Sequence, residues 1–266
     1  MQYAADLGFS WGMTTNGILI NDEIIEKMKN TKMSTISISL DGTEDFHDEF
    51  RGVKNSFKKI VENVKKLKAA NFLNSIQITT VVSKNNINCL EEVYKIVSDL
   101  GITSWRILNI EPIGRAEDNA NLYLNDNEYK YLIHYIKNKR KKSKFTVTYG
   151  CAHFLGIEYE KEVRKNCYTC YAGLSIGSIL LNGDIFVCPN VERRPELIQG
   201  NVRFDDFVEV WEKKFEWFRN LDKFKICEEC SKCEDWKYCL GESVHSWDFE
   251  NQKPKICMNK ILNGEK

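Results

Sequence analysis

The chain has 266 residues, enough to bury the core of one large domain or of two smaller ones. Its 38 Lys and Arg balance 38 Asp and Glu, so no excess charge points to nucleic acid or a membrane surface as a partner. Apolar residues make up 42% of the chain, and no apolar run is long enough to span a bilayer. We therefore expect neither nucleic-acid binding nor membrane insertion.

The first residues have the pattern of the end of a helix, with Gly8 as its stop. A domain rarely begins with the last turns of a helix, so we expect N-terminal sequence to be missing. Residues 9–14 can form a short strand that runs into the turn signal Thr15-Asn16-Gly17.

Strand and helix patterns alternate with short links up to residue 149, which is typical of repeated β-α units and a right-handed parallel sheet. We expect Asp22 and Ser56 to cap the helices that follow the first two strands. Cys89 is predicted to be a packed core thiol of the helix that stops at Gly101. The expected strands lie at residues 9–14, 35–42, 76–83, 105–110 and 145–149.

The second of these strands alternates strictly between apolar and polar residues. One face holds Ile36, Ile38 and Leu40, and the other holds Ser37, Ser39 and Asp41. In a parallel sheet covered by helices both faces should be apolar. The polar face therefore indicates a lumen or ligand side, the alternative being a solvent-facing edge strand.

From about residue 151 the alternation stops and a cysteine-rich stretch begins. Cysteines two residues apart can bind one metal centre without backbone strain, and eight thiolates would serve two four-thiolate centres, either iron–sulfur or zinc. A disulfide-stapled secreted domain fits poorly, and reduced thiols without a targeting segment predict a cytoplasmic protein. The eight cysteines are Cys167, Cys170, Cys188, Cys227, Cys230, Cys233, Cys239 and Cys257.

Three local signals organise this stretch. Asn182-Gly183 predicts a β-hairpin with Cys188 at its exit. Residues 204–221 form an amphipathic pattern, so we expect a helix whose Trp and Phe residues belong to the core. Beyond it, the loops that carry residues 227–239 should be shielded by Trp236 and Tyr238.

At this point the sequence resembles the radical S-adenosylmethionine (SAM) enzymes with a C-terminal SPASM domain. The motifs of the α/β part are Thr15-Asn16-Gly17, Ser37-Ile-Ser39-Leu-Asp41-Gly42, His47-Asp48 and Arg51-Gly52. Those of the cysteine-rich part are Cys170-x12-Gly183-x4-Cys188, Cys230-x2-Cys233-x5-Cys239 and a gap to Cys257. The resemblance implies an α/β fold, with a partial (β/α)6 TIM-like barrel lacking its first strands at residues 1–150. A small SPASM domain with auxiliary [4Fe–4S] clusters would follow at residues 151–266.

Two defining features of the resemblance are absent from this chain, namely the C-x3-C-x2-C loop of the SAM-cleaving cluster and the glycine-acid stretch beside it. Both belong upstream of Gly8 in the family, so we expect the polypeptide alone not to cleave SAM. Pro189 stands where the sulfatase-maturing branch has an Asp, which argues against formylglycine formation.

The resemblance also implies two unequal auxiliary sites. One of them has a full set of ligands, Cys230, Cys233, Cys239 and Cys257, and is called the second site below. The first site would use Cys167 (or Cys151), Cys170 and Cys188. Ser243 occupies the position of its fourth cysteine. Either Cys227 replaces that ligand, or the iron is open to water or to a substrate thiol.

For the SAM side, the resemblance and barrel geometry point to polar side chains at the carboxyl ends of strands. Ser39 and Asp41 are the first candidates for contacts to SAM, supported by Asn16 and Arg51, with Asn109 and Glu111 as further lining residues. Hydrogen bonds that cap or order a loop are the alternative for each. No residue is assigned a catalytic role.

By resemblance, the full-length protein would modify a ribosomally made peptide or protein, with SAM as cofactor and flavodoxin or ferredoxin as reductant. A different interpretation is a zinc-binding interaction module without catalysis, in which Cys167-x2-Cys170 and Cys227-x2-Cys230 form a split site. A third is an inert truncation that does not fold alone, because the edge of a partial barrel would be exposed.

Overall fold

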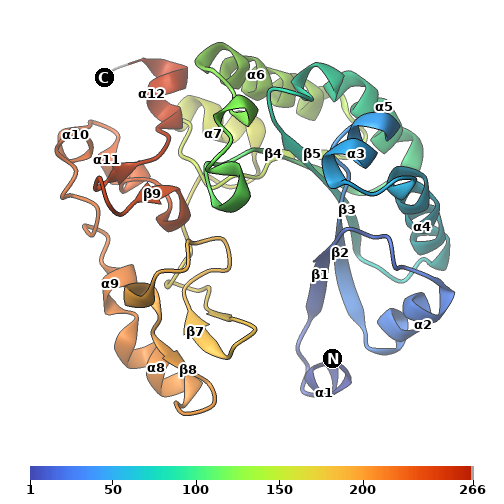
Figure 1. Cartoon of the computed structure of the whole chain (residues 1–266), viewed down its shortest axis with the longest axis horizontal. Helices are drawn as coiled ribbons and strands as arrows, with labels where there is room; N and C mark the ends of the chain where they lie inside the picture. Colours follow the sequence, from blue (N-terminus) through green and yellow to red (C-terminus); the bar gives the residue numbers. More distant parts are fainter. Residues whose placement is uncertain (265–266) are drawn as a thin grey trace. The chain divides into compact units, whose positions relative to one another are not determined.

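The computed structural model describes residues 1–264, which form two compact units (Figure 1). The sheet unit comprises Met1–Ile110, Asn121–Cys151 and Glu162–Lys165. The cysteine unit comprises Glu111–Ala120, Ala152–Lys161 and the chain from Asn166 on. Within residues 1–264, no helix has both the length and the apolar character needed to cross a membrane.

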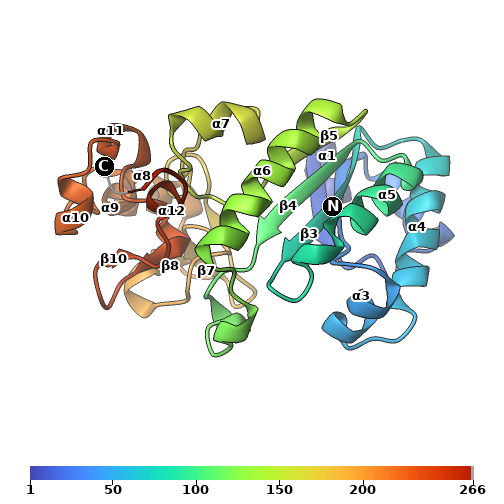
Figure 2. The same cartoon turned by 90° about the horizontal axis from the view of Figure 1, so that it is seen from above.

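The sheet unit is built on five parallel strands in the order β1-β2-β3-β4-β5. Helices connect the strands and lie along one face of the curved sheet in Figure 1, and Figure 2 shows α6 running beside β4 and β5. This arrangement confirms the predicted α/β fold with a parallel sheet. The strands are β1 (Trp11–Thr15), β2 (Met33–Ser39), β3 (Ser75–Val82), β4 (Ser104–Asn109) and β5 (Thr146–Tyr149). The helices are α1 (Gln2–Asp6), α2 (Asp22–Asn30), α3 (Glu44–Arg51), α4 (Ser56–Ala70), α5 (Leu90–Leu100) and α6 (Asp126–Lys142), while α7 (Ile157–Val163) spans the boundary between the two units along the chain.

The alternation predicted for β2 is confirmed by burial. Ile36, Ile38 and Leu40 are fully buried under the helices. On the opposite face Ser37 is half-buried, and its hydroxyl hydrogen-bonds that of Thr79 on β3 at 2.7 Å. The second face of the sheet is therefore polar across two neighbouring strands.

Strand β1 is an edge strand. Among the described strands it pairs with β2 alone, and Gly12–Thr14 are exposed. Met13, for example, is 38% exposed. One row of its backbone groups is thus available for pairing with a further strand.

Three predicted local details are wrong. The cap of α2 is Asn21 rather than Asp22, since its side chain accepts the hydrogen bond of the Ile24 amide at 2.9 Å. Asn55 rather than Ser56 stands at the cap position of α4, and Ser56 instead donates to Asp48 at 2.8 Å. Cys89 is half-buried in a 3₁₀ turn, because the neighbouring Leu90 points into the core.

The cysteine unit consists of small elements. The predicted hairpin is present, with Gly183 at a φ of +91° and its amide donating to the Leu180 carbonyl at 2.9 Å. It contributes β6 (Ser178–Ile179) and β7 (Asp184–Phe186) to an antiparallel sheet completed by β8 (Gly200–Asn201). The other elements are α8 (Phe207–Lys214), α9 (Glu216–Arg219), α10 (Glu228–Ser231), α11 (Trp236–Cys239), β9 (Trp247–Asp248), β10 (Lys253–Pro254) and α12 (Met258–Asn263).

The single helix predicted over residues 204–221 is wrong, because the helix breaks at Phe215 into α8 and α9. The Arg219 guanidinium donates to the carbonyl groups of Trp211 and Glu212, which would otherwise be unpaired at the end of α8. Phe215 and Phe218 are fully buried, as the core interpretation predicted.

Candidate functional site

The strand ends of the sheet unit carry most of the residues predicted to contact SAM. Asn16 follows β1 and Ser39 ends β2, so both lie at the carboxyl edge of the parallel sheet. Asn16 is exposed, and its side chain accepts a hydrogen bond from the Ile18 amide at 3.2 Å. Ser39 is half-buried. The structure thus places these two side chains at one edge, with Asn16 also ordering its own turn.

The side chains of Asp41 and Arg51, both candidates for the SAM side, contact each other. The Asp41 side chain is fully buried, and its Oδ2 accepts from Arg51 Nε at 2.6 Å. Its Oδ1 accepts from the Val81 amide at 2.9 Å. His47 lies against the pair, and burial lowers its pKa despite the nearby Asp41 carboxylate. These are the loop-ordering bonds named above as the alternative to a SAM contact.

Asn109 ends β4 and is buried beside β5. Its Oδ1 accepts from the Tyr149 hydroxyl, and its Nδ2 donates to the Ile110 carbonyl at 3.1 Å. The Cys151 thiol donates to the Asn109 carbonyl at 3.6 Å. Asn109 therefore joins two strand ends, and Cys151 is held within the sheet unit.

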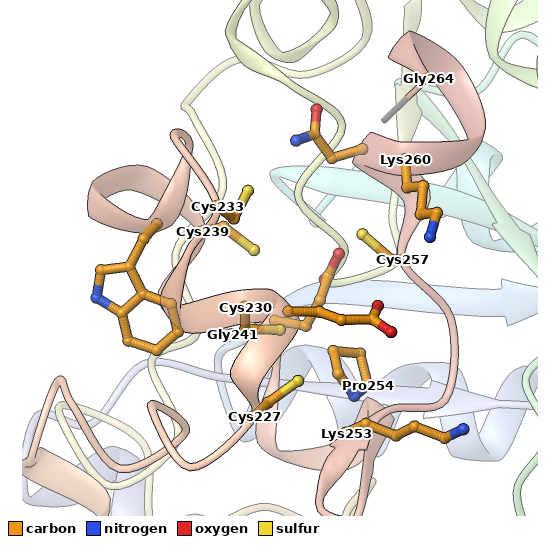
Figure 3. A pocket seen from close by; sticks show the side chains of 14 residues that line it. Cys227, Cys230, Cys233, Cys239, Gly241, Lys253, Pro254, Cys257, Lys260 and Gly264 are labelled. Atoms are coloured by element: carbon orange, nitrogen blue, oxygen red, sulfur yellow. The ribbon is translucent and has the colours of Figure 1, made fainter. Parts of the chain in front are cut away.

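A single pocket in the cysteine unit gathers five of the eight candidate metal ligands (Figure 3). They come from α10, α11 and the residues just before these helices and α12. The whole pocket, which further residues such as Trp236 and Glu242 also line, has a volume of about 440 Å³. The five are Cys227, Cys230, Cys233, Cys239 and Cys257.

Burial raises the pKa of three of these thiols, Cys230, Cys239 and Cys257. Neighbouring thiols raise the pKa of all three further, and the Glu242 carboxylate also raises that of Cys239 and Cys257. Backbone amides of Gly241 and Glu242 partly offset the effect at Cys239. Thiolates are the form that binds metal, so loading this pocket must displace protons.

The pocket offers five thiols, one more than a four-coordinate zinc ion or a four-thiolate cluster requires. Within residues 1–264, no three His, Cys, Asp or Glu side chains are arranged to hold one metal ion. An iron–sulfur cluster spreads its cysteine ligands around a larger body. The five cysteines therefore provide the thiol donors that a [4Fe–4S] cluster requires.

The other cysteines form a separate, looser group. Cys188 follows β7, and its pKa is raised by burial and by the nearby Cys170 thiol, against the lowering effect of the Asn190 and Val191 amides. Cys167 is exposed. Lys223 lies near Cys170, and burial lowers its pKa.

The side chain at the position where the family has a further cysteine is buried and hydrogen-bonded within the protein. Ser243 is fully buried, and its hydroxyl hydrogen-bonds that of Ser246 at 2.9 Å. Cys227, the substitute considered for it, lies in the five-cysteine pocket and packs into the core of the cysteine unit. Trp236 lines that pocket as predicted, but Tyr238 is 45% exposed, so its predicted shielding role is wrong.

Sequence reasoning missed His153 and Glu242, which form a charge cluster with Glu111 beside the five-cysteine pocket. His153 is fully buried, with Nε2 at 2.7 Å from Glu111 Oε1 and Nδ1 at 3.4 Å from Glu242 Oε2. Burial alone would lower the pKa of His153, but the two carboxylates raise it to about 10. Glu111, expected as a lining residue of the SAM site, is part of this cluster in the cysteine unit. No local motif joins these three residues, because they are distant in sequence.

Comparison with known families agrees with the motifs. Residues 2–97 match the family model of the Radical SAM superfamily, and residues 167–234 match that of SPASM, an iron–sulfur cluster-binding domain. The chain therefore contains a region that matches the radical SAM superfamily, followed by a region that matches the SPASM domain. These two domains imply [4Fe–4S] clusters and SAM as its cofactors.

Similar proteins cover nearly the whole chain. The AdoMet-dependent heme synthase of Methanosarcina barkeri is 28% identical over 95% of this chain and 76% of its own length. The mycofactocin maturase MftC of Mycobacterium tuberculosis is 29% identical over 86% of this chain and 57% of its own. Streptococcus suis SuiB bound to S-adenosylmethionine superposes with a TM-score of 0.72 at 17% identity, over 98% of this chain and 60% of SuiB. The last likeness confirms the fold, a partial TIM-like barrel followed by a small cysteine-rich domain.

Proposed function

We propose that residues 151–266 hold two auxiliary [4Fe–4S] clusters and that residues 1–150 form part of the SAM side of a radical SAM enzyme acting on a peptide or protein. The observation that carries the proposal is the set of five cysteines that line one pocket. Its thiol donors suit a cluster. When bound, the clusters and SAM supply one-electron transfer and radical hydrogen abstraction.

Each of the two groups of cysteines would hold one of the two clusters. We assign the second cluster to Cys230, Cys233, Cys239 and Cys257. The first would be held by Cys167, Cys170 and Cys188. Its fourth iron position would be open to water or a substrate thiol, which is supported by the location of Cys227 in the other pocket and by the Ser243–Ser246 hydrogen bond.

On the SAM side we propose Ser39 and Asn16 as direct contacts at the carboxyl edge of the sheet. Asp41 and Arg51 would fix the loop that follows β2, as their mutual contact and the Val81 hydrogen bond support. The 266 residues contain no C-x3-C-x2-C sequence, so we propose that they do not cleave SAM by themselves.

A tetrapyrrole substrate is the second candidate, because the heme synthase of M. barkeri matches more of the chain than MftC does. The peptide proposal rests on the likeness to a maturase. For either substrate we propose flavodoxin or ferredoxin as the electron source and a reducing cytoplasm as the compartment, where thiols remain available for clusters.

The test begins with the DNA upstream of the Met1 codon. An in-frame C-x3-C-x2-C would define a longer protein, which should release 5′-deoxyadenosine from SAM under reducing, anaerobic conditions, while the 266-residue chain should not. A stop codon directly upstream would favour a binding role. Incubating the active protein with an iron tetrapyrrole and with cellular peptides, followed by mass spectrometry, would separate the two substrate classes.

A further inference from the structure

Glu242 is a buried carboxylate that lines the five-cysteine pocket. It is 3% exposed. Its Oε2 accepts from the Phe154 amide at 3.1 Å, while its Oε1 is buried without a hydrogen-bond partner in the described part of the chain. A buried, unpaired carboxylate oxygen is unfavourable. Its place in the pocket wall puts this carboxylate next to whatever occupies the pocket.

The backbone that positions Glu242 also positions a cysteine. Leu240, Gly241 and Glu242 have consecutive left-handed φ values of +55°, +81° and +74°. Non-glycine residues adopt this conformation at a cost, and such strain concentrates at functional sites. The turn directs the amides of Gly241 and Glu242 toward the Cys239 sulfur. One strained turn thus places both a ligand and a carboxylate.

His153 helps to fix the position of the Glu242 carboxylate. Its ring lies between Glu242 and Glu111, with Nδ1 at 3.4 Å from Glu242 Oε2 and Nε2 at 2.7 Å from Glu111 Oε1. With the imidazole protonated and both carboxylates ionised, the three groups carry a net charge of −1. The side chain of Glu242 therefore brings a fixed negative charge to the pocket.

The remaining charged groups of the pocket are exposed. Glu229, Lys253 and Lys260 line it from the solvent side. Their charges are screened by water and salt, whereas the charge of Glu242 acts through the protein interior. Among the described charged residues that line the pocket, Glu242 alone is buried.

We propose that Glu242, held by His153, lowers the reduction potential of the cluster bound by Cys230, Cys233, Cys239 and Cys257, making the reduced cluster a stronger electron donor. This inference rests on the proposed function. Reduction adds an electron to the cluster, and a fixed negative charge in a medium of low dielectric constant disfavours that addition. Glu242 acts through space, and His153 is a positioning residue.

The test uses the 266-residue chain reconstituted anaerobically with iron and sulfide. Cys170→Ser and Cys188→Ser are present in every variant, so that only the second site is observed. Potentiometric titration followed by electron paramagnetic resonance gives the midpoint potential. In Glu242→Gln we expect an unchanged iron content and a midpoint shifted to more positive values. Glu242→Asp, which keeps the charge, should stay close to the parent, and Glu229→Gln should shift much less.

His153→Gln extends the test in the opposite direction, because removing the imidazolium leaves two carboxylates and should make the midpoint more negative. An unchanged midpoint in Glu242→Gln would overturn the proposal, as would shifts of the same sign in the two variants. Loss of iron from a folded Glu242→Gln protein would also overturn it, because Glu242 would then be a ligand. A parent protein that binds no iron and sulfide would instead refute the proposed function.

Discussion

The Arg51 guanidinium contacts the fully buried Asp41 carboxylate, with Nε at 2.6 Å and Nη2 at 2.5 Å from Oδ2. Asp41 follows β2 and Arg51 is the last residue of α3, so the contact ties the end of a helix to the end of a strand. The amide of Val81 binds the other oxygen and extends this link to β3.

Removing the cation of this pair should destabilise the sheet unit. Arg51→Met leaves Asp41 buried without its partner, so we expect the free energy of unfolding to fall by about 3 kcal/mol. Urea denaturation measures the change. Lys58→Met is the matched control, because it removes an exposed ion pair with Glu44 and should change little. Equal losses in the two variants would contradict the role given to Asp41.

A methyl group at Gly241 should disturb the five-cysteine pocket. Gly241 has a φ of +81°, and a Cβ there would lie 2.5 Å from the Phe224 Cβ. Gly52 has a similar φ of +67° with open space around it. Gly52→Ala should cost about 1–2 kcal/mol from the left-handed backbone alone. Gly241→Ala should cost about 1–3 kcal/mol more from the clash.

Iron uptake gives an independent check on that clash. Gly241→Ala should take up less iron and sulfide than Gly52→Ala under the same anaerobic reconstitution. If both variants bind as much iron as the parent, the turn at Gly241 does not position the pocket.

The charge cluster predicts a pH dependence of stability. The pKa of His153 is raised to about 10 in the folded chain, against about 6.5 when unfolded. The folded state therefore holds a proton that the unfolded state releases, and stability declines from about pH 6.5 to about pH 10. Unfolding free energies of the metal-free chain should fall more steeply over this window than those of His153→Gln. His134→Gln, at an exposed position of α6, should follow the parent.

Single cysteine variants test the assignment of ligands. Cys230→Ser and Cys170→Ser should each lower the iron content by about half, because each disables one of two clusters. Cys227→Ser should retain most of the iron, since four other cysteines line the same pocket. Iron and sulfide analysis of the three purified variants decides this. Should Cys227→Ser lose as much as Cys170→Ser, Cys227 completes the first cluster.

Patterns that depend on neighbours along the chain could be predicted from the sequence. The alternation of Ile36, Ile38 and Leu40 matched their burial, and Asn182-Gly183 marked a real hairpin. The predicted helix cap and core residue were wrong where two neighbouring residues could take the same structural role. Asn21 caps α2 in place of Asp22, and Leu90 fills the core in place of Cys89.

Contacts between distant segments could not be predicted in the same way. The helix break at Phe215 depends on Arg219 reaching back to the carbonyls of α8. The meeting of Glu111, His153 and Glu242 has no local signature, since each lies in a different loop. The spacing of the cysteines was enough to group them into motifs. The location of Cys227 depends instead on how the chain folds around Phe224 and Trp247. The rings of these two residues stack with their centroids 3.9 Å apart.

The most direct test of the central claim is the metal content of the 266-residue chain purified without oxygen. Two auxiliary [4Fe–4S] clusters predict a brown protein with about eight iron and about eight acid-labile sulfide atoms per chain. A colourless protein that contains stoichiometric zinc and no sulfide would contradict the claim.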